Sequence, residues 1–194
     1  MDYWVLLAKS EDGAVIDAYP AGGPAEYLYD KGISLAGKYP AEATVRFSAN
    51  FPALRKAKDF QPNILNALIS SPKTQAVLRE LNVENAELLP VSLTDHRGKV
   101  AAKDYAFVNL LGSQPAIDMN KSQYKLSALK KDQIRGIDKL VLQPSKIDKT
   151  AKMFRCETLR TLVLIRDDVR AAFEKAGLTG YVVLAAEGWN GLPF

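Results

Sequence analysis

Residues able to act as a nucleophile or a base are scarce in this chain. His96 is its only histidine and Cys156 is its only cysteine. Nucleophilic catalysis needs a base beside the nucleophile, and His96 lies in a polar turn sequence that is more typical of a solvated residue. Zinc sites built from Cys and His need several such ligands, and no carboxylate cluster suggests another metal site. We therefore predict that the protein is not an enzyme and has no catalytic, metal-binding or cofactor-binding residues.

The basic residues are concentrated in one segment. Residues 121–155 contain 10 Lys or Arg and 3 Asp, a net charge of +7, whereas the whole chain has a net charge of +4. Such a segment can attract an acidic protein or a phosphate backbone, or it can form a solvated face without a partner. Its only aromatic residues are Tyr124 and Phe154, which disfavours stacking on single-stranded nucleic acid. The candidate partner-binding residues selected from this segment are Lys130, Lys131 and Arg135.

A fourth candidate lies in the C-terminal tail. Trp189 stands in the glycine-flanked sequence Glu187–Gly191, beyond the last expected strand. An exposed tryptophan in a loop is a common anchor of protein interfaces. The alternative is that its ring folds back onto the core. We include Trp189 as a candidate partner-binding residue.

The elements that must position these residues are clearest near the C-terminus. Leu162–Ile165 is a short apolar, β-branched run typical of a buried strand. Asp167 is expected to cap the following helix, and Gly177 supplies the left-handed residue at which many helices end. Tyr181–Ala185 begins a second strand. The apolar face of the helix has i, i+3, i+4, i+7 spacing and consists of Val169, Ala172, Phe173 and Ala176.

A similar segment occurs earlier in the chain. A shift of 95 residues (177 − 82), without a gap, aligns Asn82-Val83 with Gly177-Leu178. Ser71 followed by Pro72 is a strong helix-start signal, and Asn is the second choice after Gly for a left-handed helix end. We therefore predict two strand–helix–strand units of the same design. Chance similarity between two capped amphipathic helices is the alternative.

Other segments predict strands and turns without a sheet order. Tyr3–Leu7 predicts a first strand, followed by Asp12-Gly13 as a hairpin turn. Thr94–Gly98 predicts a turn between the apolar runs Glu87–Leu93 and Tyr105–Leu111. We expect an α+β fold with a mixed or mostly antiparallel sheet that contains the two similar strand–helix–strand units.

Length and composition favour one domain that spans residues 1–194, with an alternative division into intimately packed halves 1–111 and 112–194. The hydrophobic content of 47% supports a sizeable core. The N-terminal sequence does not resemble a signal peptide, and no apolar run reaches the length of a membrane span. A single cysteine fits a reducing compartment. We therefore expect a cytoplasmic protein without a membrane partner; the oligomeric state does not follow from the sequence.

Several short motifs, in this order, resemble a known family. The resemblance covers most of the chain, roughly residues 50–184, and its most specific motif is the block Lys175–Gly180. The others are Asp2–Leu6, Lys58–Phe60, Glu87–Val91, Tyr105–Leu111 and Met153–Arg155. In this combination the chain resembles the polymorphic-toxin immunity protein eleven family. It departs from the family pattern at Arg166-Asp167, where relatives often have a Ser-Glu pair.

The resemblance implies a cytoplasmic inhibitor that binds one cognate toxin, encoded nearby, and protects the producing cell in competition between bacteria. It implies no catalytic residues and no cofactor. Delivery of the toxin by a contact-dependent or type VI-like secretion system would fit this role. Two alternatives remain at this point: a nucleic-acid-binding or other regulatory binding module that uses the basic segment 121–155, and an enzyme. The absence of a recognisable catalytic constellation makes the enzyme the weakest of the three.

Overall fold

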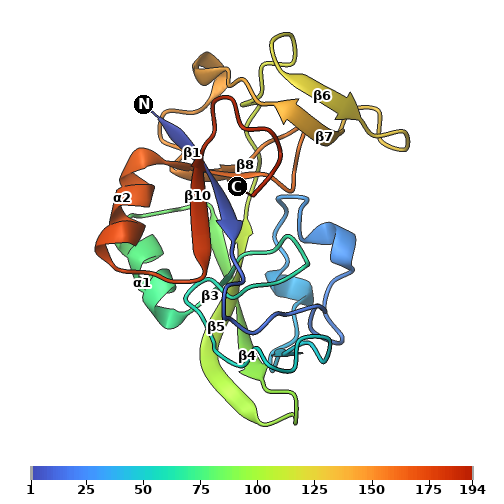
Figure 1. Ribbon diagram of the computed structural model, residues 1–194, viewed down its shortest axis with the longest axis vertical. Helices are drawn as coiled ribbons and strands as arrows, with labels where there is room; N and C mark the ends of the chain where they lie inside the picture. The colour runs from blue at the N-terminus through green and yellow to red at the C-terminus, as the bar shows by residue number, and fades with distance from the viewer. Residues whose placement is uncertain (1, 194) are drawn as a thin grey trace.

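The computed structural model describes residues 2–193, which form an α+β fold with two α-helices and three sheets (Figure 1). The α-helices are α1 (Pro72–Glu80) and α2 (Asp167–Lys175), and the short 3₁₀ helices are η1 (Glu26–Leu28), η2 (Ala36–Lys38) and η3 (Pro144–Lys146). The strands are β1 (Tyr3–Ala8), β2 (Thr44–Arg46), β3 (Ile69–Ser70), β4 (Ala86–Thr94), β5 (Val100–Leu110), β6 (Gln123–Leu126), β7 (Ile134–Lys139), β8 (Met153–Arg155), β9 (Val163–Arg166) and β10 (Tyr181–Ala185).

The sheets are mostly antiparallel. The first has the order β10-β1-β9-β8, and all of its pairs are antiparallel. The second has the order β2-β4-β5-β3 and is mixed, because β2 runs parallel to β4. The third is the two-stranded antiparallel ribbon of β6 and β7. The expected α+β class with mixed and antiparallel pairing is therefore confirmed.

Both predicted strand–helix–strand segments form, as β3–α1–β4 and β9–α2–β10. A left-handed residue follows each helix two positions after its last residue, Asn82 with φ of 52° and Gly177 with φ of 58°. The amide that follows bonds back to the last helical turn in both cases, from Val83 to the Leu78 carbonyl at 3.1 Å and from Leu178 to the Phe173 carbonyl at 3.2 Å. These bonds satisfy carbonyl groups that a helix end would otherwise leave unpaired.

The two helices begin differently. Ser71 caps α1, because its hydroxyl accepts a hydrogen bond from the Thr74 amide at 3.3 Å. The prediction that Asp167 caps α2 is wrong: the helix begins at Asp167 itself, and Arg166 holds the cap position without a capping hydrogen bond from its side chain. The Asp167 carboxylate instead accepts from the indole N–H of Trp4 at 3.0 Å. It still places negative charge at the positive end of the helix dipole.

The prediction of a hairpin at Asp12-Gly13 is also wrong. After β1 the chain does not return beside the same strand: Gly13 forms a bridge with Lys56, and Ile16 forms bridges with Phe47 and Asn63. Strand β1 lies instead between β9 and β10. The N-terminal strand thus completes a sheet made from the C-terminal quarter of the chain.

Three apolar clusters hold these layers together. The first lies beneath α1 and α2, which contact each other, and it joins Phe173 of α2 to residues of both larger sheets, among them Leu6 and Val108. The second packs the loops between β1 and β3 against β4 and β5. The third lies between the first sheet and the β6–β7 ribbon and includes Ile134 and Ile137. The ribbon is therefore fixed on one face and open to solvent on the other.

Candidate functional site

The basic candidates lie on the β6–β7 ribbon, at the top of Figure 1. Lys130 and Lys131 are exposed in the loop that joins the two strands, and Arg135 is exposed on β7. Ile134, the residue before Arg135, is buried in the third cluster. Adjacent residues of a strand point to opposite faces, so Arg135 points toward solvent.

Apolar side chains are exposed on the same ribbon. Leu129, directly before the lysine pair, is 95% exposed, and Leu126 at the end of β6 is 48% exposed. An exposed leucine by itself is ordinary. Here two leucines stand beside three cationic side chains on a projecting element, and this combination of an apolar centre with a charged rim is common in protein interfaces.

Trp189 is partly buried against the third cluster. Its indole N–H donates to the Leu192 carbonyl at 2.7 Å, and its own carbonyl accepts from the Leu140 amide at 2.8 Å. The ring therefore has a fixed position in a folded tail. Trp189 and Arg135 line the same hollow, of about 280 Å³, together with Leu7, Asn66 and Leu159 among others. Lys130 and Lys131 do not line it.

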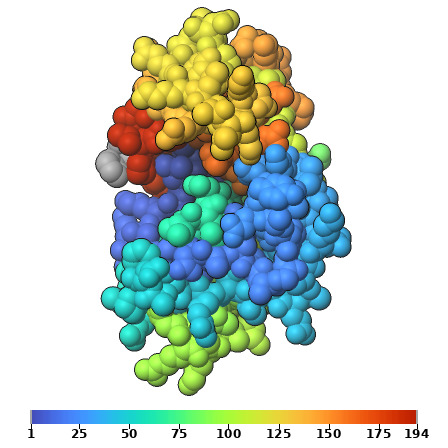
Figure 2. Space-filling view, turned by 90° about the vertical axis from the view of Figure 1, so that its right-hand side faces the viewer, coloured from blue at the N-terminus to red at the C-terminus, as the bar shows by residue number. Residues whose placement is uncertain are grey.

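A second hollow, which the sequence did not predict, adjoins the first. It has a volume of about 400 Å³ and is lined by three tyrosines, Tyr19, Tyr27 and Tyr29, and by Arg155. Asn66 and Thr161 line both hollows and connect them. Figure 2 shows the face on which the yellow ribbon, the red C-terminal tail and the blue N-terminal loops meet. The only sequence signal for Arg155 was a charged residue within the apolar run Met153–Cys156.

The two residues suited to nucleophilic chemistry do not meet. His96 lies in the β4–β5 turn, where its Nε2 contacts the Ser48 carbonyl at 3.0 Å and its ring packs against Phe47. Cys156 is fully buried in the third cluster, and burial raises the pKa of its thiol to about 12. Residues 2–193 contain no group of three or more His, Cys, Asp or Glu side chains placed to hold a metal ion.

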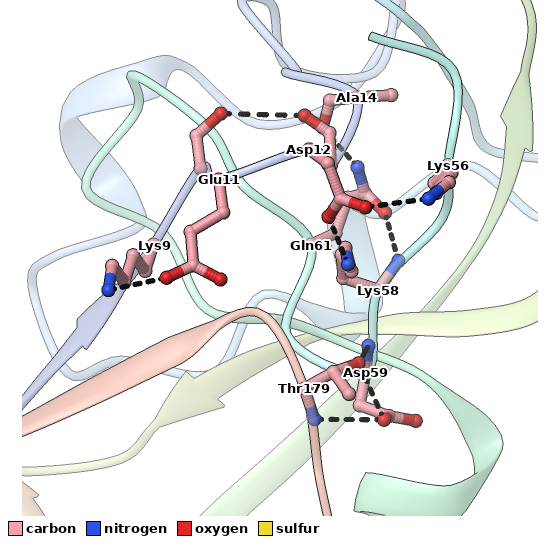
Figure 3. Close-up of polar contacts among 11 residues, drawn as sticks. Lys9, Glu11, Asp12, Ala14, Lys56, Lys58, Asp59, Gln61 and Thr179 are labelled. Carbon is pink, nitrogen blue, oxygen red and sulfur yellow. Dashed lines mark hydrogen bonds and ion pairs between the residues drawn. The ribbon is translucent and has the colours of Figure 1, made fainter.

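A polar network joins the segment after β1 to the segment before β3 (Figure 3). Asp12 pairs with Lys56 at 2.7 Å and also with Lys58. Hydrogen bonds from Lys56 and Lys58 lower the pKa of Asp12 to about 2. The Gln61 side chain accepts from the Lys58 amide at 3.1 Å and donates to the Ala14 carbonyl. The exposed Asp12–Lys56 pair contributes little stability, whereas the Lys58 side chain is only 19% exposed. Together these contacts connect the two segments.

Two of the sequence motifs meet beside this network. Asp59, from Lys58–Phe60, accepts hydrogen bonds from the Thr179 amide at 3.0 Å and the Thr179 hydroxyl at 2.8 Å (Figure 3). The Thr179 carbonyl in turn accepts from the Phe60 amide at 2.8 Å. A Cβ atom on Gly180 would lie 2.1 Å from the Phe60 carbonyl oxygen, so only glycine fits there. These motif residues therefore fasten α2 and its following turn to the segment that precedes α1.

Comparison with known protein families supplies the identity. A model of the Immunity protein family (Imm11) matches residues 10–187. The chain belongs to this family. Membership in Imm11 implies neutralisation of a cognate toxin, and proteins of such a family are typically non-catalytic. The resemblance inferred from the motifs is thereby confirmed. A comparison with curated proteins found no match.

The Imm11 match includes the Asp59–Thr179 contact, the basic ribbon and the whole lining of the second hollow. It includes the first hollow except for Leu7, Trp189, Gly191 and Pro193. Neither α-helix in residues 2–193 is long and apolar enough to cross a membrane. The contacts of Asp59, Thr179 and Gly180 are internal to the fold.

Proposed function

We propose that the protein binds one cognate toxin in the cytoplasm of the producing cell and blocks it by a non-catalytic protein–protein interaction. The observation that carries the proposal is the Imm11 match over residues 10–187. The toxin is encoded nearby and belongs to a polymorphic toxin system that uses contact-dependent or type VI-like delivery. Inhibition then comes from covering the active site of the toxin or from holding the toxin in an inactive shape.

The exposed face of the β6–β7 ribbon is the first surface that we assign to the toxin. Lys130, Lys131 and Arg135 are exposed there beside Leu129. Complementary charge raises the rate of encounter, whereas buried aromatic and arginine anchors provide most of the affinity. The ribbon therefore suits an acidic toxin surface, and the adjoining hollow with Arg135 and Trp189 suits an anchor from the same partner.

We also infer that residues 1–194 act as one domain. The support is the position of β1 within the C-terminal sheet and the first cluster, which joins residues of both proposed halves. A single cooperative transition, seen equally by circular dichroism and by tryptophan fluorescence, is the expected result of denaturant unfolding. Two separate transitions would contradict a single domain.

The two strand–helix–strand segments, we further infer, are units of one design. Their helices begin 95 residues apart (167 − 72) and end 95 residues apart (175 − 80). In each unit the two strands lie on either side of an antiparallel strand, β5 in the first and β1 in the second. Exchanging Asn82-Val83 with Gly177-Leu178 tests the idea, because interchangeable helix ends should leave the fold and most of its stability intact. Failure of the exchanged protein to fold would contradict it.

The deciding experiment is a survival assay with a co-purification. The candidate toxin from the neighbouring gene is expressed in a bacterial host with and without this protein. Rescue of growth together with a stable complex is the expected result. Absence of both would contradict the proposal, and nucleic-acid binding that falls steeply with salt would then favour the basic segment as a nucleic-acid site.

Charge reversal tests the role of the ribbon in the same complex. Replacing Lys130, Lys131 and Arg135 by Glu should slow association with the toxin at least about tenfold at low salt. The matched control replaces three exposed cationic residues of the β4–β5 hairpin by Glu: Arg97, Lys99 and Lys103. Equal association rates for the two triple variants would show that the ribbon has no part in binding.

A further inference from the structure

Arg155 is a buried cation without a counter-ion. It lies on β8 and is only 3% exposed. Its Nη1 donates to the Arg160 carbonyl at 2.8 Å, and within residues 2–193 that is the only hydrogen bond its guanidinium makes. The Nε atom is buried and has no acceptor among the residues that the structure describes. No carboxylate of residues 2–193 lies within 4.0 Å of the guanidinium.

This arrangement is costly for the free protein. A buried charge is normally paired, because removing it from water without compensation is unfavourable. Burial lowers the pKa of the Arg155 guanidinium, and the charge of Asp30 offsets this effect only from a distance. An arginine stays protonated even so. The side chain therefore brings a positive charge and unused N–H donors to a place where the fold itself does not use them.

The surroundings of Arg155 open to the surface. It lines the 400 Å³ hollow with the three tyrosines. The rings of Tyr19 and Tyr29 stack with their centroids 4.1 Å apart, and the buried Tyr29 hydroxyl has no hydrogen-bond partner in the described part of the chain. Two exposed apolar side chains stand at the rim, since Tyr27 is 63% and Ile64 is 65% exposed. Arginine and tyrosine in a partly desolvated pocket are the residue types that dominate binding energy in protein interfaces.

We propose that this hollow receives the side chain of an aspartate or glutamate of the toxin, whose carboxylate pairs with Arg155 beneath the tyrosine rim. The inference rests on the proposed function and adds a specific anchor to it. A carboxylate is the natural partner of a guanidinium, because the two planar groups form charge-assisted hydrogen bonds. The bond would satisfy the Nε donor that the free protein leaves unpaired.

Two features favour an acidic protein side chain over a free anion. Glu26 and Asp30 also line the hollow, so a doubly charged phosphate would meet two negative groups, whereas a single carboxylate has less charge to repel. The exposed side chains of Tyr27 and Ile64 and the adjoining hollow with Arg135 and Trp189 extend the site beyond the size of a small ion. A protein surface can cover both hollows at once, with Asn66 and Thr161 between them.

The first test needs no toxin. Acetyl-glutamate methylamide is titrated to millimolar concentration while the arginine Nε–Hε signals are followed by NMR. A saturable shift of the Arg155 signal is expected. The glutamine analogue should give no such shift. When the Arg155→Met variant is titrated with the glutamate probe, its remaining arginine signals should not move. The proposal is overturned if the glutamate probe causes no saturable shift, if the glutamine analogue acts equally, or if only inorganic phosphate binds.

Stability separates a binding role from a structural one. Removal of an unpaired buried charge is neutral or stabilising, whereas loss of a structural ion pair is strongly destabilising. The free Arg155→Met protein should therefore unfold at the same or a higher temperature than the wild type. A clear decrease would identify Arg155 as a structural residue and overturn the proposal. Tyr27→Ala, at the exposed rim, tests the same hollow without altering the core.

The second test uses the toxin from the neighbouring gene. Arg155→Met and Tyr27→Ala should each lower its affinity by about tenfold or more, and Arg97→Met, on the distant β4–β5 turn, should leave it unchanged. If the wild type binds the toxin and Arg155→Met binds equally well, the anchor is wrong and the proposed function stands. If the wild type does not bind, the proposed function fails, and the NMR titration still decides whether the hollow takes a carboxylate.

Discussion

The carboxylate of Asp59 holds both the amide and the hydroxyl of Thr179, which lies 120 residues further along the chain, at 3.0 Å and 2.8 Å. The other oxygen of the same carboxylate accepts from the Ser71 hydroxyl at 2.8 Å. Ser71 caps α1, and Thr179 follows the end of α2. One side chain thus connects the start of the first helix to the end of the second and sets how the two helices pack.

Loss of this connection should destabilise the protein. Asp59→Ala removes three hydrogen bonds to a charged acceptor, and we expect the free energy of unfolding to fall by about 2–3 kcal/mol. Denaturant unfolding at pH 7 measures the change. The control is Glu42→Ala, since Glu42 is exposed and its side chain makes no hydrogen bond within residues 2–193. A loss no larger than that of the control would mean that the connection does not determine stability.

The close approach at Gly180 gives a second prediction, with two matched controls. Gly180 has φ of +82°, and an added Cβ would meet the Phe60 carbonyl oxygen. Gly188 has a similar φ of +79° but open space around it, and Gly37 has open space without the left-handed backbone. Substitution by Ala should lower the free energy of unfolding most at Gly180 and least at Gly37. At Gly188 the decrease should be about 1–2 kcal/mol, from backbone strain alone. Denaturant unfolding of the three variants measures these changes. Equal losses at Gly180 and Gly188 would contradict the steric argument.

What the sequence could predict was mostly local. Ser71-Pro72, Asn82 and Gly177 mark helix ends through bonds within a few residues, and the structure has those ends. Asp167 is a residue type that often caps helices, but its carboxylate accepts a hydrogen bond from the indole of Trp4. Trp4 lies more than 160 positions away in sequence. The sheet order depends on such distant pairings throughout, so it did not follow from periodicity.

The candidate site divides in the same way. The exposure of Lys130, Lys131 and Arg135 agrees with a net charge concentrated in one segment. Arg135 and Trp189 line one hollow because the C-terminal tail returns across β7. No local sequence pattern encodes this return. Arg155 was counted with the solvated cations, and its burial becomes apparent only once β8 lies beneath the tyrosine loops.

Glu87 predicts a dependence of stability on pH. Burial alone would raise the pKa of Glu87, yet hydrogen bonds from the Leu35 amide, Ser34 and Asn109 outweigh it and hold the pKa below the ordinary value. A carboxyl whose pKa is lower in the folded state stabilises the protein above its unfolded pKa, and this contribution is lost as the pH falls through the folded pKa. Glu87→Gln should therefore be less stable than the wild type at pH 7, by about 1 kcal/mol.

The difference between wild type and Glu87→Gln should shrink as the pH falls below about 4.5, where an unperturbed glutamate becomes protonated. Denaturant unfolding at pH 7, 5, 4 and 3 follows this change. Glu42→Gln is the control and should track the wild type at every pH. If the difference in free energy of unfolding stays constant down to pH 3, the ionised form of Glu87 is not responsible for holding the loop before η2 against β4.

Leu129 allows binding to be separated from stability. Its side chain is 95% exposed beside Lys130 and Lys131, so Leu129→Ser should change the free energy of unfolding by no more than about 0.5 kcal/mol. If the ribbon contacts the toxin, burial of this leucine contributes to the complex, and the substitution should weaken binding by about tenfold. Val100→Ser, at an exposed apolar position of the β4–β5 hairpin, is the control. Unchanged affinity of Leu129→Ser, measured by calorimetry, would place the toxin away from the ribbon tip and leave the two hollows as its contact surface.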